Sequence, residues 1–227
     1  MNIPARIHHV LVLAGLCPAW LAGCATQQPA PKGVEAKPGI PWWVAPPSAP
    51  LPEGFPKPGP VDEVIVKQYP AYRAAVADRD VAQGGRSTSD GLFYPLFNHI
   101  ESHHIAMSSP VEMTYQQPAT SQPDVKVPSL ESMAFIYTSP TVGEAGKDGP
   151  VRVVDVPATT VASVGVIGSY DEQHFLAGKA KLDAWLAAHA SEYAAAGKPR
   201  HLAYNSPFVL PFMRYSEVQI PVVPVKK

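Results

Sequence analysis

Alternating and helical hydrophobic patterns divide most of the chain into two successive sets of elements. The first set begins with a strand over residues 63–77, in which apolar and polar positions alternate and Pro70 marks a bend. After a polar loop, residues 89–103 predict a helix whose apolar residues recur three and four positions apart. Residues 105–115 and 132–138 then predict two strands that are separated by a polar loop containing proline.

The second set repeats this order of elements. Residues 151–168 are extended, with Pro157 in the place of the earlier proline, and residues 171–196 predict a long helix that ends at a Gly-Lys-Pro sequence. Residues 200–212 and 215–223 predict the last two strands. We therefore predict an α+β fold of two duplicated β-α-β-β units. Since neither unit can bury its helix face alone, we expect one cooperative domain.

The N-terminal residues have the composition of a targeting segment. Residues 10–16 are an apolar run that is too short to cross a bilayer as a helix, and small residues precede Cys24. This pattern predicts a signal peptide over residues 1–23 and resembles the lipobox of bacterial lipoproteins, in which the cysteine is lipidated. A plain secretory signal, with Cys24 incidental, is the alternative. Ala25 follows the cysteine instead of Asp, so by analogy with such lipoproteins we expect an anchor in the outer membrane, facing the periplasm.

The predicted lipidated cysteine and a proline-rich tether occupy residues 24–60. From residue 29 to residue 60, 11 of 32 residues are proline, which excludes a regular helix or a paired central strand. Such a segment is a stiff spacer between a membrane and the folded domain that we expect over residues 61–227. Trp42 and Trp43 interrupt it, and we expect them to pack against the domain or the bilayer interface. Docking of another envelope protein on these tryptophans is the alternative.

Composition and charge exclude several classes of function. The formal net charge is −1 and no basic cluster is present, so we do not expect nucleic-acid binding. Of the two cysteines, Cys17 lies in the signal peptide and Cys24 would carry lipid, which leaves the mature domain without a disulfide, a catalytic thiol or a cysteine metal site. The motifs of serine hydrolases, P-loop enzymes and dinucleotide-binding enzymes are absent, and we therefore expect a protein that is not an enzyme.

Four short stretches carry a resemblance to a known family. They are residues 64–70 (VIVKQYP), 105–111 (IAMSSPV), 204–208 (YNSPF) and 214–218 (RYSEV). In this order and spacing they resemble the SOUL haem-binding proteins, in whose I-x-M-T-x-P-V and R-x-N-E-V motifs this chain has Ser108 for Thr and Ser216 for Asn. The resemblance covers roughly residues 61–224. It implies a distorted eight-stranded antiparallel barrel with two flanking helices, and it implies binding of haem or a related tetrapyrrole.

The resemblance also implies a place for the tetrapyrrole. In similar proteins the ligand lies against the first helix, which points here to the apolar residues Phe93, Phe97, Ile100 and Met107. The alternative for these residues is that they belong to the core. Haem propionates need cations, and Arg214, Lys179 or Lys181 could supply them. Arg214 is, however, better placed in the sequence to be the ion-pair partner of Glu217.

Ligation of haem iron depends on the histidines. Some members of the family have a histidine before the tyrosine of the first strand, whereas this chain has Gln68. The substitutes are His99, His103 and His104 at the end of the first helix, where a positive charge also favours the helix C-terminus. His99 and His103 are four residues apart and could instead chelate Zn²⁺, Cu²⁺ or Ni²⁺, but the sequence offers no third ligand. We therefore expect no metal site beyond haem iron. Without an iron ligand, a tetrapyrrole would be held by packing and propionate contacts alone.

These observations lead to one leading hypothesis and two alternatives. The leading hypothesis is a membrane-tethered, non-enzymatic lipoprotein that binds haem or a related porphyrin for buffering, trafficking or sensing. The first alternative is a ligand-free lipoprotein of the same fold that docks another envelope protein. The second is a binder of some other flat apolar molecule, since a fold does not determine its ligand.

Overall fold

The computed structural model describes residues 39–79, 89–116 and 130–225. The predicted signal peptide, the lipidation of Cys24 and the first part of the tether lie outside the described residues. No helix among the described residues is both long enough and apolar enough to cross a membrane.

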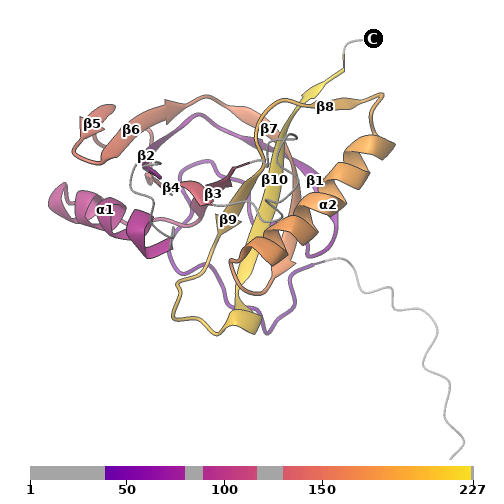
Figure 1. Cartoon of the computed structure of the whole chain (residues 1–227), viewed down its shortest axis with the longest axis horizontal. Helices are drawn as coiled ribbons and strands as arrows, with labels where there is room; N and C mark the ends of the chain where they lie inside the picture. Colours follow the sequence, from indigo (N-terminus) through magenta and orange to yellow (C-terminus); the bar gives the residue numbers. More distant parts are fainter. Residues whose placement is uncertain (1–38, 80–88, 117–129, 226–227) are drawn as a thin grey trace, which may run out of the picture. The chain divides into compact units, whose positions relative to one another are not determined.

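Two helices and one large antiparallel sheet make up this part of the chain (Figure 1). The helices are α1 (Ser89–Ser102) and α2 (Glu172–Ala188). The strands are β1 (Val64–Tyr69), β2 (Tyr72–Asp78), β3 (Val111–Tyr115), β4 (Leu130–Ile136), β5 (Gly146–Asp148), β6 (Val151–Val156), β7 (Thr159–Ile167), β8 (Tyr193–Ala195), β9 (Arg200–Ala203) and β10 (Tyr215–Pro224), and the 3₁₀ turn η2 (Pro211–Met213) precedes β10. The predicted α+β class is confirmed.

The strands follow the order β1-β7-β10-β9-β3-β4-β2-β6-β5, and β8 pairs with β10 beside this path. Registers are continuous across the middle of the sheet, where Glu217 of β10 lies opposite Leu202 of β9 and Gly165 of β7. Strands β1 and β5 end the path, so the described sheet is open, and the expected closed eight-stranded barrel is not found. Among the described residues β1 pairs only with β7 and β5 pairs only with β6, so no strand hydrogen bonds join the two ends of the path. The duplication of β-α-β-β units stays a prediction.

Both helices pack on the sheet, at its two ends. α1 contacts β2 and β4, whereas α2 contacts β7 and β10, and Figure 1 shows α1 and α2 far apart along the sheet. Alternation along β10 decides which side chains lie beneath α2. Val218 and Ile220 are buried in the main core with α2, whereas Glu217 and Gln219 point to the opposite face of the sheet.

Residues 39–60 cover that opposite face. Val44 is buried in a second core with Tyr69 and Tyr204, and Phe55 packs against this core. The ring centroid of Phe55 lies 4.9 Å from that of Tyr69 in an edge-on arrangement. Backbone hydrogen bonds also join the segment to the loops around β9 and β10. The folded unit therefore includes residues that we had assigned to the tether, because the apolar residues between the prolines pack against the sheet.

Prolines and short strands shift several predicted boundaries. Pro70 separates β1, which pairs with β7, from β2, which pairs with β4 and β6, so the single bent strand that we predicted is two strands. Helix α2 ends at Ala188 rather than continuing for another two turns, because residues 193–195 form β8 against the end of β10. Residues 204–210 leave the sheet after the short strand β9 and lead into η2, so the strand that we predicted over residues 200–212 ends at Ala203.

Candidate functional site

A groove beside α1 contains three of the four apolar residues that the resemblance implicates. Phe93 and Phe97 lie one helical turn apart and stack, with ring centroids 5.9 Å apart and planes 14° apart. Phe93 also meets the buried ring of Phe135 edge-on at 5.2 Å, which fixes its orientation, whereas Phe97 is 37% exposed. Met107 lines the same space, which has a volume of about 210 Å³. We call it the α1 groove.

Ile100, the fourth residue, lies beneath the helix. It is 4% exposed and belongs to the main core together with Leu92 and Leu96. These three side chains form the stripe by which α1 rests on the sheet. Ile100 is therefore a core residue, which was the alternative to a role in ligand binding, and it does not line the groove.

The loop after β9 forms another wall of the α1 groove, and Arg214 holds this loop in place. Pro207 lines the groove, and its carbonyl oxygen accepts a hydrogen bond of 2.6 Å from Arg214. The Nε of Arg214 donates to the carbonyl oxygen of Val209, and its guanidinium lies 5.6 Å from the ring centre of Tyr170. The expected pairing of Arg214 with Glu217 is wrong, because Glu217 points to the opposite face of the sheet and has another partner.

The two lysines that could have met haem propionates lie elsewhere. Lys179 and Lys181 are on α2, which packs on the other half of the sheet from α1. Lys179 pairs with Asp183 one turn along the helix, and Lys181 pairs with Asp62. The structure therefore does not bring these lysines together with the α1 groove.

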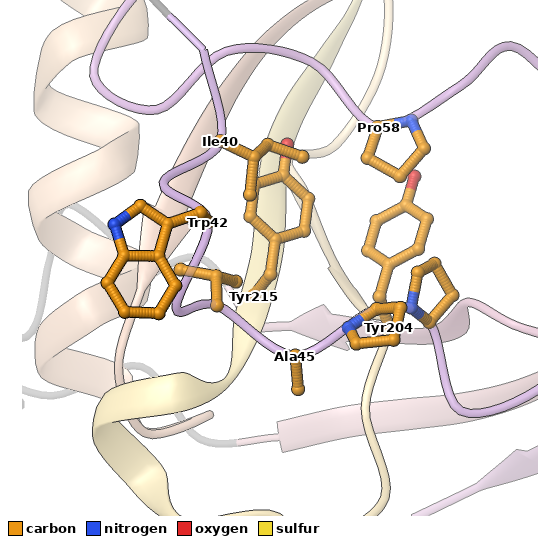
Figure 2. Close-up of a pocket in the computed structure, with 9 residues that line it drawn as sticks. Ile40, Trp42, Ala45, Pro58, Tyr204 and Tyr215 are labelled. Atoms are coloured by element: carbon orange, nitrogen blue, oxygen red, sulfur yellow. The ribbon is translucent and has the colours of Figure 1, made fainter.

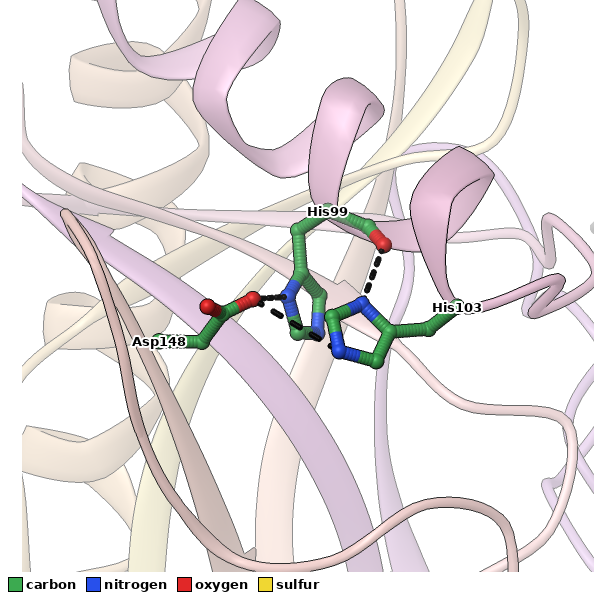
Figure 3. A group of neighbouring side chains, drawn as sticks. All are labelled: His99, His103 and Asp148. Atoms are coloured by element: carbon green, nitrogen blue, oxygen red, sulfur yellow. Dashed lines mark hydrogen bonds and ion pairs between the residues drawn. The ribbon is translucent and has the colours of Figure 1, made fainter.

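The histidines at the end of α1 divide into a pair and a single residue. His99 and His103 lie together with Asp148 at the end of β5 (Figure 3). Oδ2 of Asp148 is 2.6 Å from Nδ1 of His99 and 3.8 Å from Nε2 of His103, and Nε2 of His99 is 2.7 Å from the hydroxyl of Tyr137. His104 is exposed and has a positive φ of 54° just after the helix. None of the described residues that line the α1 groove is a histidine.

Sequence reasoning missed Asp148 as a neighbour of these histidines. It lies 49 residues beyond His99, in a short polar stretch between glycines that carries no periodicity. Only the pairing of β5 with β6, and of β6 with β2 beneath α1, brings it to the helix end. No local signal in the sequence connects them.

A buried polar network lies on the opposite face of the sheet, under residues 39–60. Glu217 is fully buried, and its carboxylate accepts hydrogen bonds from Lys67 Nζ at 2.5 Å and from the hydroxyls of Tyr215 and Tyr204 at 3.0 and 3.2 Å. Burial opposes ionisation of Glu217, but the Lys67 ammonium and these donors hold its pKa below the ordinary value. Burial and the charge of Glu217 raise the pKa of Tyr215, so this hydroxyl stays protonated and donates.

Arg200 extends the network toward the first half of the sheet. It donates to Glu112 at 2.9 Å, to the hydroxyl of Tyr72 at 2.8 Å and to Gln219 at 3.1 Å. Burial disfavours the charged form of Arg200, yet Glu112 beside it raises the pKa of the guanidinium, so Arg200 stays charged. The sequence of β1 contains a signal for this network. Lys67 and Tyr69 are two residues apart, so their side chains point to the same face of the strand, and a lysine beside a buried tyrosine indicates a buried partner.

A pocket of about 300 Å³ opens beside the network (Figure 2). Trp42, Pro58, Tyr204 and Tyr215 line it, and in Figure 2 the ring of Tyr215 stands between Trp42 and Tyr204. Trp42 is 94% exposed at its rim and Trp43 is 40% exposed, so Trp42 lines a surface opening and does not tuck into the domain.

Residues 60–221 match the SOUL heme-binding protein family. The chain belongs to this family. Membership suggests that the protein binds haem or another tetrapyrrole, and it favours a binding role over an enzymatic one. The match includes the histidine pair, Phe93, Phe97 and Met107 of the α1 groove, and Lys67, Arg200 and Glu217 of the buried network. No curated protein sequence matches the chain.

Solved structures share the fold at low sequence identity. The EcmrR–DNA complex has a TM-score of 0.54 and 13% identity, covering 72% of this chain, which spans 58% of the length of the EcmrR chain. An uncharacterised conserved protein from Listeria innocua has a TM-score of 0.53 and 10% identity over 72% of this chain and 94% of its own. A protein from Listeria innocua described as a hydrolase has a TM-score of 0.51 and 10% identity over 73% and 94%. At these identities the likeness concerns the fold alone.

Proposed function

We propose that this SOUL domain binds haem or a related tetrapyrrole, without catalysing a reaction, in the α1 groove. The observation that carries the proposal is that the nearly parallel rings of Phe93 and Phe97 line the groove, in a family whose name gives haem as the ligand. A porphyrin offers a flat apolar face, and such faces are held by aromatic and apolar side chains with few polar groups. Phe97 supplies exposed aromatic surface for this contact, and Met107 supplies a thioether.

The size of the groove restricts how a tetrapyrrole would be held. Its volume of about 210 Å³ is below the range of roughly 300–1,000 Å³ that is typical of enclosed small-molecule sites. The ligand would therefore lie partly exposed, with one face against the helix. Of the described lining residues, Met107 and Tyr204 are of types that can bind iron, but the hydroxyl of Tyr204 donates to Glu217 on the opposite face of the sheet. That leaves the thioether of Met107, which is a weak ligand on its own. We therefore expect iron-free porphyrin to bind about as well as haem.

Titration of the purified protein with haem and with protoporphyrin tests this proposal. Saturable changes in the Soret band and in porphyrin fluorescence are expected in the wild type. Phe97→Glu, which places a charge in the groove, should abolish both. Tyr94→Glu is the matched control, because Tyr94 is a 63% exposed aromatic residue of the same helix that does not line the groove. Equal binding by wild type and Phe97→Glu would show that the ligand binds elsewhere, and no saturable binding at all would remove the proposed function.

A second candidate function, docking of another envelope protein, is favoured by the exposure of Trp42. Trp42 is 94% exposed beside a pocket lined by Tyr204 and Tyr215, and tryptophan and tyrosine are enriched where proteins dock. Co-purification from solubilised envelopes, with Trp42→Ala compared with Phe212→Ala, tests this role. A partner lost only with Trp42→Ala supports docking at the pocket. Recovery of the same proteins with both variants counts against it.

The pocket beside Trp42 is also the place where another flat apolar molecule would bind. It is about 300 Å³ in volume and is lined by Tyr204 and Tyr215. Because Tyr204 lines both this pocket and the α1 groove, variants at the far walls separate the two sites. A molecule that binds in this pocket should lose affinity in Trp42→Ala and keep it in Phe97→Glu, whereas a molecule that binds in the groove should do the reverse.

We further propose that the protein is a bacterial envelope lipoprotein anchored through Cys24. The support is the sequence pattern before this cysteine, which resembles a lipobox. Metabolic labelling with a palmitate analogue should mark the wild type and not Cys24→Ser, and fractionation should then place the wild type in the outer membrane. Labelling of both proteins, or of neither, would contradict the anchor.

A further inference from the structure

The side chains of His99, His103 and Asp148 converge at the end of α1 (Figure 3). One nitrogen of each imidazole and one carboxylate oxygen lie within 4.8 Å of one another. The two rings are 4.4 Å apart between centroids, as residues one helical turn apart can be. We propose that these three residues bind a divalent transition-metal ion of the Zn²⁺ class, at a site separate from the α1 groove.

The hydrogen bond of His103 determines which of its nitrogens is free to bind a metal. Its Nδ1 is 2.9 Å from the carbonyl oxygen of His99, and a carbonyl oxygen can only accept. Nδ1 therefore carries the proton, and in the neutral ring Nε2 holds a lone pair. In this neutral form the lone pair faces Oδ2 of Asp148, 3.8 Å away. A cation between the two atoms would turn an unfavourable approach into two bonds.

His99 is held by contacts at both of its ring nitrogens. Its Nδ1 lies 2.6 Å from Asp148 and its Nε2 lies 2.7 Å from the hydroxyl of Tyr137. Without a metal, Nδ1–H can donate to the carboxylate while Tyr137 donates to Nε2. When a metal binds Nδ1, the ring proton moves from Nδ1 to Nε2, and Nε2–H can donate to Tyr137 instead. The imidazole therefore stays neutral, and neither of its nitrogens is left unpaired. His99 is 6% exposed, which keeps its ring in place before a metal arrives.

The donor set fits this class of metal ion. Two imidazole nitrogens and one carboxylate oxygen are typical ligands of Zn²⁺ and its first-row neighbours, whereas Mg²⁺ and Ca²⁺ prefer oxygen. Bond lengths of about 2.0–2.2 Å place two ligands of one ion roughly 3.3 Å apart, so modest side-chain rotations would complete the site. A hollow of about 480 Å³ beside His99 and Asp148, lined by Asn98 and Ser102 among others, leaves room for a water molecule as the fourth ligand.

The metal site and the α1 groove lie on different sides of the helix. Residues two positions apart on a helix do not share a face, and Phe97 and His99 are two positions apart. Accordingly, Phe97 lines the groove whereas His99 lines the hollow at Asp148. Metal binding is therefore expected to be independent of porphyrin binding, and Phe97→Glu should not change it.

Titration of the purified untagged protein with Zn²⁺ and Co²⁺ tests the site. We expect one ion per chain by calorimetry, and Co²⁺ should give visible d–d bands that Zn²⁺ then removes. His103→Gln and Asp148→Asn should each weaken binding by at least about tenfold, as loss of a ligand does. Because His103 and Asp148 are about half exposed, these variants are expected to fold.

His104→Asn is the matched control. It removes a neighbouring exposed imidazole, and Asn tolerates the positive φ of this position better than most residues. Binding in this variant should equal that of the wild type. The proposal is overturned if the protein binds no ion at micromolar concentration, if His103→Gln and Asp148→Asn bind like wild type, or if His104→Asn loses as much affinity as they do.

Discussion

Lys67 and Glu217 form an ion pair inside the fold, with Nζ and Oε1 2.5 Å apart and side chains that are 4% and 0% exposed. They come from β1 and β10, two strands that do not pair with each other but both pair with β7. The backbone N–H of Gly59 donates to the same carboxylate oxygen, at 2.6 Å. The pair therefore joins the start of the domain, the middle of the sheet and the segment that covers it.

Removing one member of this pair should destabilise the protein strongly. Lys67→Met keeps the aliphatic length of the side chain but leaves Glu217 buried without its cation, which costs about 3–5 kcal/mol in comparable buried pairs. Adding Glu217→Gln should restore much of the loss, because the uncompensated charge is then gone. Urea unfolding of the two variants measures both effects. Lys181→Met, which breaks an exposed pair with Asp62, should change little. A small effect of Lys67→Met would show that the pair contributes little to stability.

Stability should fall as the pH is lowered through the titration range of His201. This side chain is buried among the rings of Phe175 and Tyr115, and neither of its nitrogens has a hydrogen-bond partner in the described structure. Burial, assisted by the nearby His174, lowers the pKa of His201 from 6.5 to about 4. The unfolded chain therefore binds more protons than the folded protein between these two values. The free energy of unfolding should decrease by up to about 3 kcal/mol as the pH drops from 6.5 to 4.

Unfolding of His201→Phe as a function of pH checks this prediction. The substitution keeps an aromatic ring and removes two unpaired nitrogens, so the slope between pH 6.5 and 4 should flatten. A further loss of stability below about pH 4.5 should remain, because the lowered pKa of Glu217 makes its stabilising effect disappear as the carboxylate is protonated. An unchanged slope in His201→Phe would assign the pH dependence to other groups.

The sequence predicted the elements that depend on a local pattern of residues. It did not predict contacts between segments that are far apart in the chain. The apolar stripe of α1 predicted the helix correctly, because Leu96 and Ile100 are buried by the periodicity that is visible in the sequence. Asp148 and Lys67 acquire their partners only through strand order, which no local spacing contains. The α1 groove was found only through the family resemblance, since Phe93 and Phe97 look like ordinary core residues in the sequence. Arg214 was given the wrong partner because Glu217, three residues further on, lies on the other side of its strand.

Residues 39–60 should be needed for stability, although their proline content suggested a spacer. A chain that begins at Val61 would lose Gly59 as a donor to Glu217 and would uncover the second core. We expect it to unfold at lower urea concentration than a chain that begins at Gly39. Phe55→Ala in the longer chain should cost about 2 kcal/mol, since Phe55 meets the rings of two tyrosines edge-on, while Trp42→Ala should cost little. Equal stability of the two chain lengths would contradict a structural role for the segment.

Gly178 and Gly91 should respond in opposite ways to the same substitution by alanine. Each lies in a helix, where alanine is favoured over glycine by about 1 kcal/mol. A Cβ on Gly178 would meet Cγ2 of Val218 at 2.5 Å, because α2 approaches β10 closely there, whereas a Cβ on Gly91 would meet nothing within 4 Å. Gly178→Ala should therefore destabilise the protein by about 1–3 kcal/mol through overpacking, and Gly91→Ala should stabilise it slightly. Adding Val218→Ala to Gly178→Ala should cost less than the sum of the two single changes, because the truncated side chain makes room for the new methyl group. Additive losses in thermal unfolding would show that α2 moves away from the sheet instead of resting on a fixed contact at Gly178.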